Sequence, residues 1–194
     1  MFMFRSVKPT AEKAGVMSDG ERIEQMIAEW GERNYPNGPT WYDRTKNEPL
    51  PALEIRMISA FNALEYNISN GGWAQFLWNC FPDWRAIIAD AKEGYLLIGA
   101  PEQSAALDKL YALCERDERE CYEMHKRANE AFEKERNDGW STIFGEFTSR
   151  DRSAAADDWE ELFWDKALYE KRRSWLAANE ARVRQAYGCG VSSD

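Results

Sequence analysis

The chain of 194 residues has one histidine, four cysteines and no CxxC pair. Cysteines this sparse give neither the disulfide framework of a small secreted protein nor the ligand spacing of a zinc ribbon. A single imidazole without a nucleophile elbow leaves little basis for Ser/His or Cys/His catalysis. Glycine-rich phosphate loops are also absent, because Gly71 and Gly72 are followed by Trp73. We therefore expect neither an enzyme nor a bound cofactor.

The one histidine lies at helical spacing from two cysteines and an acid, in the series Cys114, Glu118, Cys121 and His125. A helix rises about 1.5 Å per residue, so roughly 16 Å separates Cys114 from His125, and only the last two residues of the series could share an ion. Apolar residues continue the same stripe in both directions. We therefore expect a half-buried core face here and no metal site.

Long apolar runs are missing as well. The longest, from Tyr95 to Ala100, is far shorter than the roughly 18 residues that a membrane span needs. Met1 to Lys8 has neither an apolar secretory segment nor a small-residue cleavage site. We therefore expect a soluble, cytoplasmic protein that does not bind membranes.

Basic residues are outnumbered, with 25 Lys and Arg against 34 Asp and Glu and a net charge of -9. A protein that binds nucleic acid by counterion release needs a basic face, so direct binding of nucleic acid is not expected. Hydrophobic residues still make up 44% of the chain and aromatic residues 13%. This is enough material for a core and excludes a disordered acidic tail.

Helical periodicity recurs along the chain, whereas no segment alternates polar and apolar residues as a strand does. Ser18 is placed to cap a first amphipathic helix that includes Trp30. Residues 33–50 are predicted to form a long loop held by Tyr35, Trp41 and Tyr42. Further helices are predicted over residues 51–67, 73–80, 82–96, 101–137 and 154–187, with an apolar connector at 140–147. We expect an all-α, single-domain helix bundle over residues 18–187 with a long C-terminal helix, a flexible arm at 1–17 and a flexible tail at 188–194.

The stretch from Glu65 to Asn79 has the pattern E-x-x-x-x-N-G-G-aromatic-x-Q-aromatic-x-x-N. It resembles the signature of the bacterial DNA-mimic-protein-like family, an all-helical domain of unknown function. The run from Tyr95 to Ala100 is similar to the family's next element, a helix that ends in an I-G-A step. The resemblance covers about residues 51–179 and implies the fold. The family is named after an acidic protein that imitates the DNA backbone, so the resemblance also implies a DNA-binding protein as partner.

The residues of this motif favour a structural role. The two glycines permit a turn with positive φ, the two aromatics lie three apart on one face, and Gln75 and Asn79 are i,i+4 neighbours able to bond each other or the turn. An enzyme would instead need a pocket around Glu65, Asn70 and Gln75. A capped corner with a polar network explains all motif residues, which are Glu65, Asn70, Gly71, Gly72, Trp73, Gln75, Phe76 and Asn79.

The acidic residues are the candidate partner-binding surface. Five acids and no base lie between Asp157 and Asp165. Carboxylates four residues apart on a helix are about 6 Å apart, near the spacing of phosphates along one DNA strand. One face of the predicted C-terminal helix then carries a row of carboxylates from Asp157, Asp158, Glu161 and Asp165.

One such row is too sparse to imitate a duplex. Three charges over about 12 Å compare with roughly seven on duplex DNA of that length. A mimic therefore needs a second row, and the first helix offers Glu21, Glu24 and Glu32. The alternative interpretation is a solvated surface without a partner, because acids early in a helix and bases late in it suit the helix dipole.

We predict a non-enzymatic, acidic binding protein that occupies the basic site of a DNA-binding protein. Two alternatives stay open at this point. One is an immunity-type or antitoxin protein that blocks a basic nuclease through aromatic contacts from the loop with Trp41 and Tyr42. The other is an enzyme with a pocket at the Gly71–Gly72 corner. The sequence also leaves a homodimer open.

Overall fold

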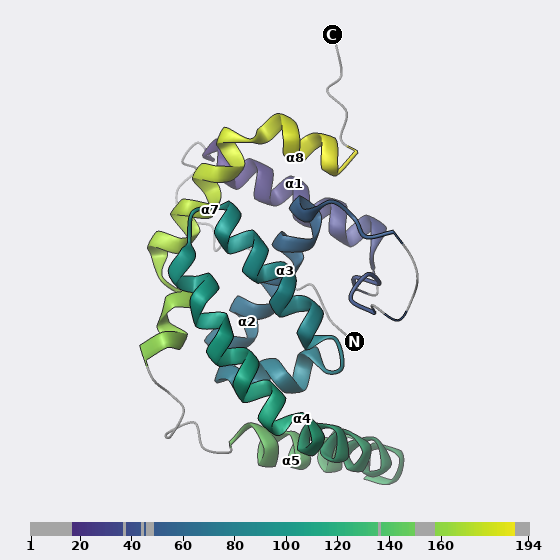
Figure 1. The fold of residues 1–194 in the computed structure, drawn as a ribbon. Helices are drawn as coiled ribbons and strands as arrows, with labels where there is room; N and C mark the ends of the chain where they lie inside the picture. The colour runs from purple at the N-terminus through teal and green to yellow at the C-terminus, as the bar shows by residue number, and fades with distance from the viewer. Residues whose placement is uncertain are drawn as a thin grey trace.

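The computed structural model describes residues 17–36, 38–43, 45, 49–135, 137–149 and 158–188. Every regular element in these ranges is helical, so the predicted all-α multi-helix fold is confirmed (Figure 1). Apart from Met17 and Gly188, the predicted arm and tail lie outside the described residues, and the single-domain assignment stays a prediction. The elements are α1 (Asp19–Asn34), α2 (Leu53–Cys80), α3 (Trp84–Leu97), α4 (Pro101–Glu135), α5 (Asn137–Thr148), the 3₁₀ helix η1 (Asp158–Phe163), α7 (Lys166–Ala178) and α8 (Glu180–Ala186).

Helix α1 begins where its sequence predicts. The Ser18 hydroxyl accepts a hydrogen bond from the backbone N–H of Glu21 at 3.3 Å, and the Glu21 carboxylate accepts one from the N–H of Ser18 at 2.9 Å. This reciprocal pair is a capping box, which satisfies two donors that the helix start leaves without partners. Ile23 and Ile27 are buried on the inner face of the helix.

Helix α2 is the centre of the molecule and packs against α3, α4, α5 and η1. Its side chains Phe61, Phe76 and Trp78 are fully buried, and each contributes about 1.5–3 kcal/mol by leaving water. Close packing with α3 depends on Gly94, because a Cβ at that position would lie 2.5 Å from the Cβ of Met57. The core therefore forms around the same chain segment that carries the NGG motif.

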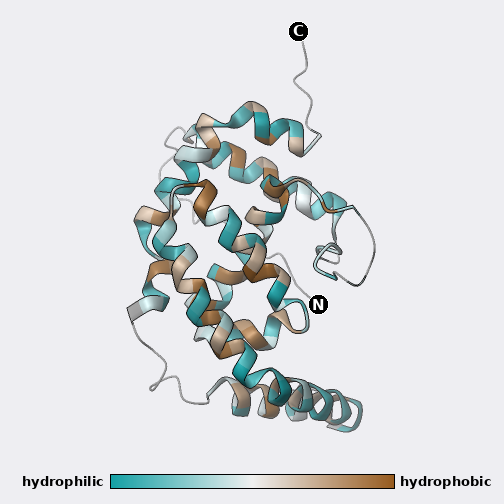
Figure 2. Ribbon diagram, in the orientation of Figure 1, coloured by the Kyte–Doolittle hydropathy of each residue, from teal (hydrophilic) through white to brown (hydrophobic). Residues whose placement is uncertain are grey.

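Helices α4 and α5 form a hairpin that extends from this core (Figure 1). The end of α4 agrees with the predicted helix 101–137. The predicted connector 140–147 is wrong, because these residues belong to α5. Trp140, Phe144 and Phe147 follow one another at helical spacing and pack on Trp78. Figure 2 shows that the far end of α4 is mostly hydrophilic.

The predicted helix over residues 154–187 is also wrong. Residues 154–157 lie outside the described part, and three separate elements follow, namely η1, α7 and α8. Asp165 has extended backbone angles and its carboxylate accepts the N–H of Ala167 at 3.0 Å, so it caps a new helix. A second break occurs at Asn179.

Helix α1 lies beside α7 and α8 on one side of the molecule (Figure 1). The loop that follows α1 is held by aromatic contacts, as its sequence predicts. Trp41 and Tyr42 are 7% and 6% exposed, and Tyr35 contacts Trp41 edge to face.

None of the helices in the described ranges combines the length and the apolar character that crossing a membrane requires.

Candidate functional site

Helix α2 is kinked at the NGG motif, where Gly71 and Gly72 leave helical geometry. Gly72 has φ of 71° and ψ of -170°, a backbone conformation that disfavours any residue with a Cβ. A Cβ at Gly71 would collide with the side chain of Gln75. The motif glycines therefore let one chain segment form two helical stretches that meet at a corner.

The corner is closed from outside by an acid of η1. The Oε1 atom of Glu160 accepts the backbone N–H of Trp73 at 2.9 Å. This N–H belongs to the first turn after the kink, where helical donors lack partners within the helix. In the sequence Glu160 is one of the five acids between Asp157 and Asp165, and its contact with Trp73 spans 87 residues of the chain, so no local pattern indicates it.

The polar residues of the motif divide into separate contacts. Asn79 donates to the Oδ1 of Asn67 at 2.7 Å, and Asn67 donates to the carbonyl oxygen of Ala63 at 2.6 Å. Asn70 donates to the carbonyl of Tyr66. Trp73 and Phe76 are buried. Among the described residues, no hydrogen bond joins Gln75 to Asn79, the pair that the sequence allows to bond each other.

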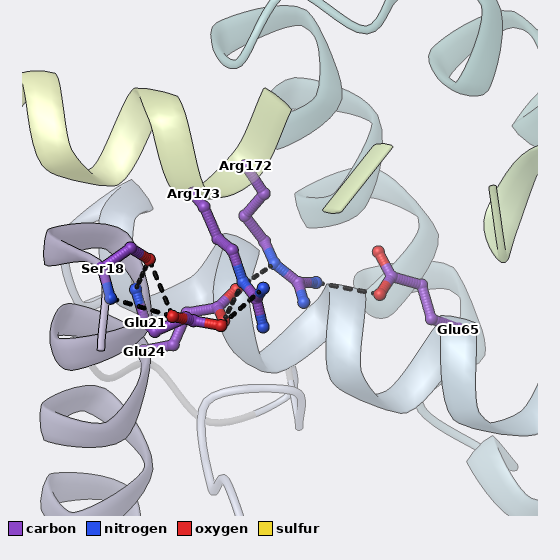
Figure 3. Close-up of polar contacts among 6 residues, drawn as sticks. All are labelled: Ser18, Glu21, Glu24, Glu65, Arg172 and Arg173. Atoms are coloured by element: carbon purple, nitrogen blue, oxygen red, sulfur yellow. Dashed lines mark hydrogen bonds and ion pairs between the residues drawn. The ribbon is translucent and has the colours of Figure 1, made fainter. Parts of the chain in front are cut away.

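Glu65 belongs to a different cluster, which joins four helices. Its Oε2 accepts Nη1 of Arg172 at 2.8 Å and its Oε1 accepts the Tyr95 hydroxyl at 3.1 Å. Arg172 also donates through Nε to Glu24 at 2.8 Å (Figure 3). The contact from α1 through α7 to α2 therefore runs through one guanidinium, and Glu65 does not join Asn70 and Gln75 in a pocket.

This cluster is buried. The Arg172 side chain is 11% exposed and that of Glu65 is 6% exposed. Burial raises the pKa of the Glu65 carboxyl, and the attraction of Arg172 offsets part of that rise. Burial acts to lower the pKa of Arg172, but the carboxylates of Glu65 and Glu24 outweigh it and raise the pKa. The guanidinium is therefore charged in the folded protein.

The acidic row predicted on α1 is mostly neutralised. Glu24 binds both Arg172 and Arg173, and Glu21 binds Arg173 at 2.9 Å (Figure 3). The Glu24 side chain is only 21% exposed. Glu32 is exposed near the C-terminal end of the helix. Glu21 and Glu24 therefore join α1 to α7, which the sequence does not reveal because the pairing residues lie more than a hundred positions away.

The acidic row predicted over residues 157–165 does not form a continuous α-helical face. Asp157 lies outside the described residues, as does the side chain of Asp158. Glu161 belongs to the 3₁₀ helix η1, and Asp165 caps α7. Both side chains are exposed. The spacing of four residues along one α-helix is therefore wrong, although both acids face solvent in the same short segment.

A third exposed acid, Glu102, lies at the start of α4, which packs against η1. The amide Nε2 of Gln103 donates to the carbonyl oxygen of Leu162 at 3.3 Å, which brings the start of α4 against η1. Glu102 directly precedes Gln103 in the chain and Glu161 directly precedes Leu162, and both acids are exposed. We call Glu102, Glu161 and Asp165 the acidic junction. No ion pair joins them to another residue in the part of the chain that the structure describes.

The stripe with His125 is a core face. The imidazole ring of His125 stacks on the Trp78 ring with centroids 4.1 Å apart, and its Nε2 atom lies 3.0 Å from the Trp78 carbonyl oxygen. Burial raises the pKa of the Cys121 thiol to about 12, so the thiol is protonated. Glu118 binds Arg85. Among the described residues, no three His, Cys, Asp or Glu side chains are grouped so as to hold a metal ion.

Acid should destabilise the fold through His125. Burial lowers its pKa below the ordinary 6.5, although the bond to the Trp78 carbonyl opposes the shift. Unfolding then takes up a proton between the lowered pKa and 6.5, so the free energy of unfolding falls as pH decreases through this range. His125→Gln should remove this part of the pH dependence. Urea unfolding at several pH values checks it, and parallel pH profiles for both proteins would contradict it.

Two shallow hollows lie at the surface near these residues. One, of about 270 Å³, is lined by the kink of α2 together with Glu160 and Trp164. The other, of about 580 Å³, lies between Ile98 and the outer face of α7. Neither is lined by a histidine or a cysteine. Each lining combines apolar and polar side chains.

Comparison with known proteins gives one match. No curated protein and no solved structure is similar to the chain. A family model described as DMP19-like protein matches residues 49–179, which include the NGG motif, α2 to α5, η1 and α7. This range covers more than half of the chain and nearly coincides with the 51–179 expected from the motif. The chain belongs to the DMP19-like protein family.

Proposed function

We propose that the protein is a non-enzymatic binding protein whose exposed carboxylates occupy the DNA-binding site of a basic partner. The net charge of -9 and membership of the DMP19-like family support this function. One observation carries the proposal, the contrast between the two acidic segments. Glu21 and Glu24 of α1 are neutralised by Arg172 and Arg173, whereas the acids of the acidic junction face solvent without an ion pair to a described residue.

Unpaired carboxylates at one place give a negative field that a basic cleft recognises. Asp157 directly precedes η1 and Asp158 is the first residue of η1, so both extend the same acidic segment along the chain. Lysine and arginine side chains that normally bind phosphates bind carboxylates with similar charge-assisted hydrogen bonds. Such a contact is steered by long-range attraction and weakens as salt increases.

The two alternatives have less support. An immunity-type protein that uses the loop after α1 would need accessible rings, but Trp41 and Tyr42 are almost wholly buried. An enzyme at the NGG corner would need Glu65 near Asn70, but Glu65 binds Arg172 and Tyr95 instead. A partner that recognises negative charge fits the exposed residues better.

Neutralising the acidic junction should weaken partner binding about ten- to hundredfold, because three exposed charge contacts are lost. The variant is Glu102→Gln, Glu161→Gln and Asp165→Asn, in which asparagine keeps the cap of α7. The partner is captured from native host extract at low salt, identified by mass spectrometry and purified. Affinities are then measured by calorimetry at two salt concentrations.

The matched control changes three exposed acids of α4, with Glu123→Gln, Glu130→Gln and Glu133→Gln. It alters the net charge equally but leaves the acidic junction intact, so its affinity should stay near that of the wild type. Equal losses of affinity in both variants would show that binding depends on total charge alone, which would contradict a localised site. Circular dichroism verifies that all three proteins are folded.

A further inference from the structure

The 3₁₀ helix η1 carries part of the acidic junction and is fixed to the core by two aromatic rings. Phe163 is fully buried and Trp159 is 9% exposed. Their ring centroids lie 6.1 Å apart, edge to face, and Phe163 also packs on Tyr95 of α3 with centroids 5.9 Å apart. Glu161 lies between the two rings in the chain and is exposed. The rings therefore hold η1 against the core while Glu161 faces solvent.

Two hydrogen bonds orient η1 on the core. The Oε1 atom of Glu160 accepts the backbone N–H of Trp73 at 2.9 Å, which joins η1 to α2. Gln103 donates to the carbonyl oxygen of Leu162 at 3.3 Å, which joins η1 to α4. The attraction between buried apolar groups has no direction, whereas a hydrogen bond weakens steeply when its angle changes. The rings therefore anchor η1, and these hydrogen bonds fix its rotation.

The kink of α2 supplies both the donor and the space for the Glu160 carboxylate. Because the helix is interrupted at Gly71 and Gly72, Trp73 lies in the first turn of the second stretch, where backbone N–H groups lack helical acceptors. A Cβ at Gly72 would lie 3.1 Å from Oε1 and 3.3 Å from Oε2 of Glu160. The carboxylate therefore fits against the kink because position 72 has no side chain.

We propose that the hydrogen bond from the Trp73 N–H to Glu160 is a latch that holds the acidic junction in its binding geometry. The proposal rests on the proposed function, because the acidic junction is the surface that the latch positions. Glu161 directly follows Glu160, so a rotation of η1 moves this carboxylate relative to Glu102 and Asp165. An ordered surface binds more tightly than a mobile one, since less conformational entropy is lost on binding. Glu160 is therefore a positioning residue that acts through Glu161.

The first test follows the isolated chain by NMR on protein labelled with ¹⁵N. Glu160→Ala removes the acceptor, so the backbone amide of Trp73 should exchange with solvent about ten- to hundredfold faster. The backbone amides of residues 158–162 should also lose order on the picosecond to nanosecond timescale. Glu160→Gln keeps a carbonyl acceptor and should restore most of the protection of the Trp73 amide. Unchanged exchange and unchanged order in Glu160→Ala would overturn the proposal.

The second test measures affinity for the purified partner and separates positioning from charge. Glu160→Ala should weaken binding about three- to tenfold, because η1 must then be ordered at the expense of binding free energy. Glu160→Gln removes the same charge but keeps the acceptor, so it should recover most of the affinity lost in Glu160→Ala. Equal losses of affinity in the two variants would show that the partner reads the Glu160 charge directly, which would overturn the latch.

Gly72→Ala disturbs the latch without changing any charge. Its Cβ would press on the Glu160 carboxylate, so affinity for the partner should again fall about three- to tenfold. Gly99→Ala is the matched control, because Gly99 also has a positive φ, of 76°, but no described residue outside its chain neighbours lies within 4 Å of a Cβ built there. It should leave the affinity unchanged, and equal losses in both variants would overturn the proposal. Circular dichroism verifies folding, and if Gly72→Ala does not fold, the Glu160 variants decide.

Failure of the latch and failure of the proposed function give different results. A mobile η1 in Glu160→Ala with unchanged affinity for the partner would refute the latch and leave the acidic junction untouched. Unchanged affinity after neutralisation of Glu102, Glu161 and Asp165 would refute the proposed function, whatever the NMR measurements on the Glu160 variants show.

Discussion

Replacing Arg172 by methionine should lower the free energy of unfolding by about 3–5 kcal/mol, because it leaves the buried Glu65 carboxylate without its cation. The substitution keeps much of the apolar stem, so the loss reports the charge more than the packing. Chemical denaturation followed by circular dichroism measures it. Arg173→Met is the matched control, since that residue shares Glu24 but is 42% exposed. It should cost less than about 1 kcal/mol.

A second substitution tests whether the loss of stability in Arg172→Met comes from the Glu65 carboxylate that is left without a cation. If the cost comes from an unpaired carboxylate, adding Glu65→Gln to Arg172→Met should recover part of the stability, since a neutral amide needs no cation. Additive losses in the double variant would contradict this explanation. So would equal losses in Arg172→Met and Arg173→Met.

Replacing Trp78 by alanine should also cost about 3–5 kcal/mol, because the ring is 1% exposed and its removal leaves a cavity. Trp78 packs on Phe144 with ring centroids 5.7 Å apart and stacks on His125. It therefore holds α5 and the outer part of α4 to the core. Hydrogen exchange should accelerate first in α5, in addition to the global loss measured in denaturant.

Tyr122→Ala supplies the control for Trp78→Ala. Its side chain lies on α4 near the same region but is 54% exposed, so the expected cost is within about 0.5 kcal/mol. A loss in Tyr122→Ala as large as that in Trp78→Ala, or protection of α5 that does not change, would show that the ring of Trp78 does not anchor the hairpin.

The sequence predicts the helices that carry local signals. The capping box at Ser18, the kink at Gly71 and Gly72, and the end of α3 before Pro101 all follow from residue types at fixed positions. Helical periodicity predicts the wrong element where a residue suits both a helix interior and a helix start. The spacing of the acids puts Asp165 within a helical row, but aspartate is also a favoured N-cap, and in the structure its carboxylate caps α7.

The pairing of charges could not be predicted. Arg172 is one of several bases in a helix of mixed charge, and its partners Glu24 and Glu65 lie 148 and 107 residues away along the chain. Local spacing gives no information at such distances. The same limit explains why the acids of α1 were predicted to be a partner surface, although two of them fix the helix to α7.

Residues 140–147 have aromatic residues at helical spacing, although the preceding Asp138 and Gly139 indicate a break. Asp138 and Gly139 indicate a break, and the break between α4 and α5 does occur just before them. Trp140, Phe144 and Phe147 nevertheless repeat at helical spacing, and burial against Trp78 stabilises a helix there. Tertiary packing therefore decides the structure of a segment that reads locally as a connector.

If the protein occupies the DNA-binding site of its partner, the protein and DNA compete for that site, and a displacement titration detects the competition. The purified partner is held on a fluorescent DNA duplex, and the chain is added while anisotropy reports bound DNA. We predict complete displacement at saturation, with the Glu102→Gln, Glu161→Gln and Asp165→Asn variant requiring about ten- to hundredfold more protein. A ternary complex in which the DNA stays bound while the chain also binds would contradict the account.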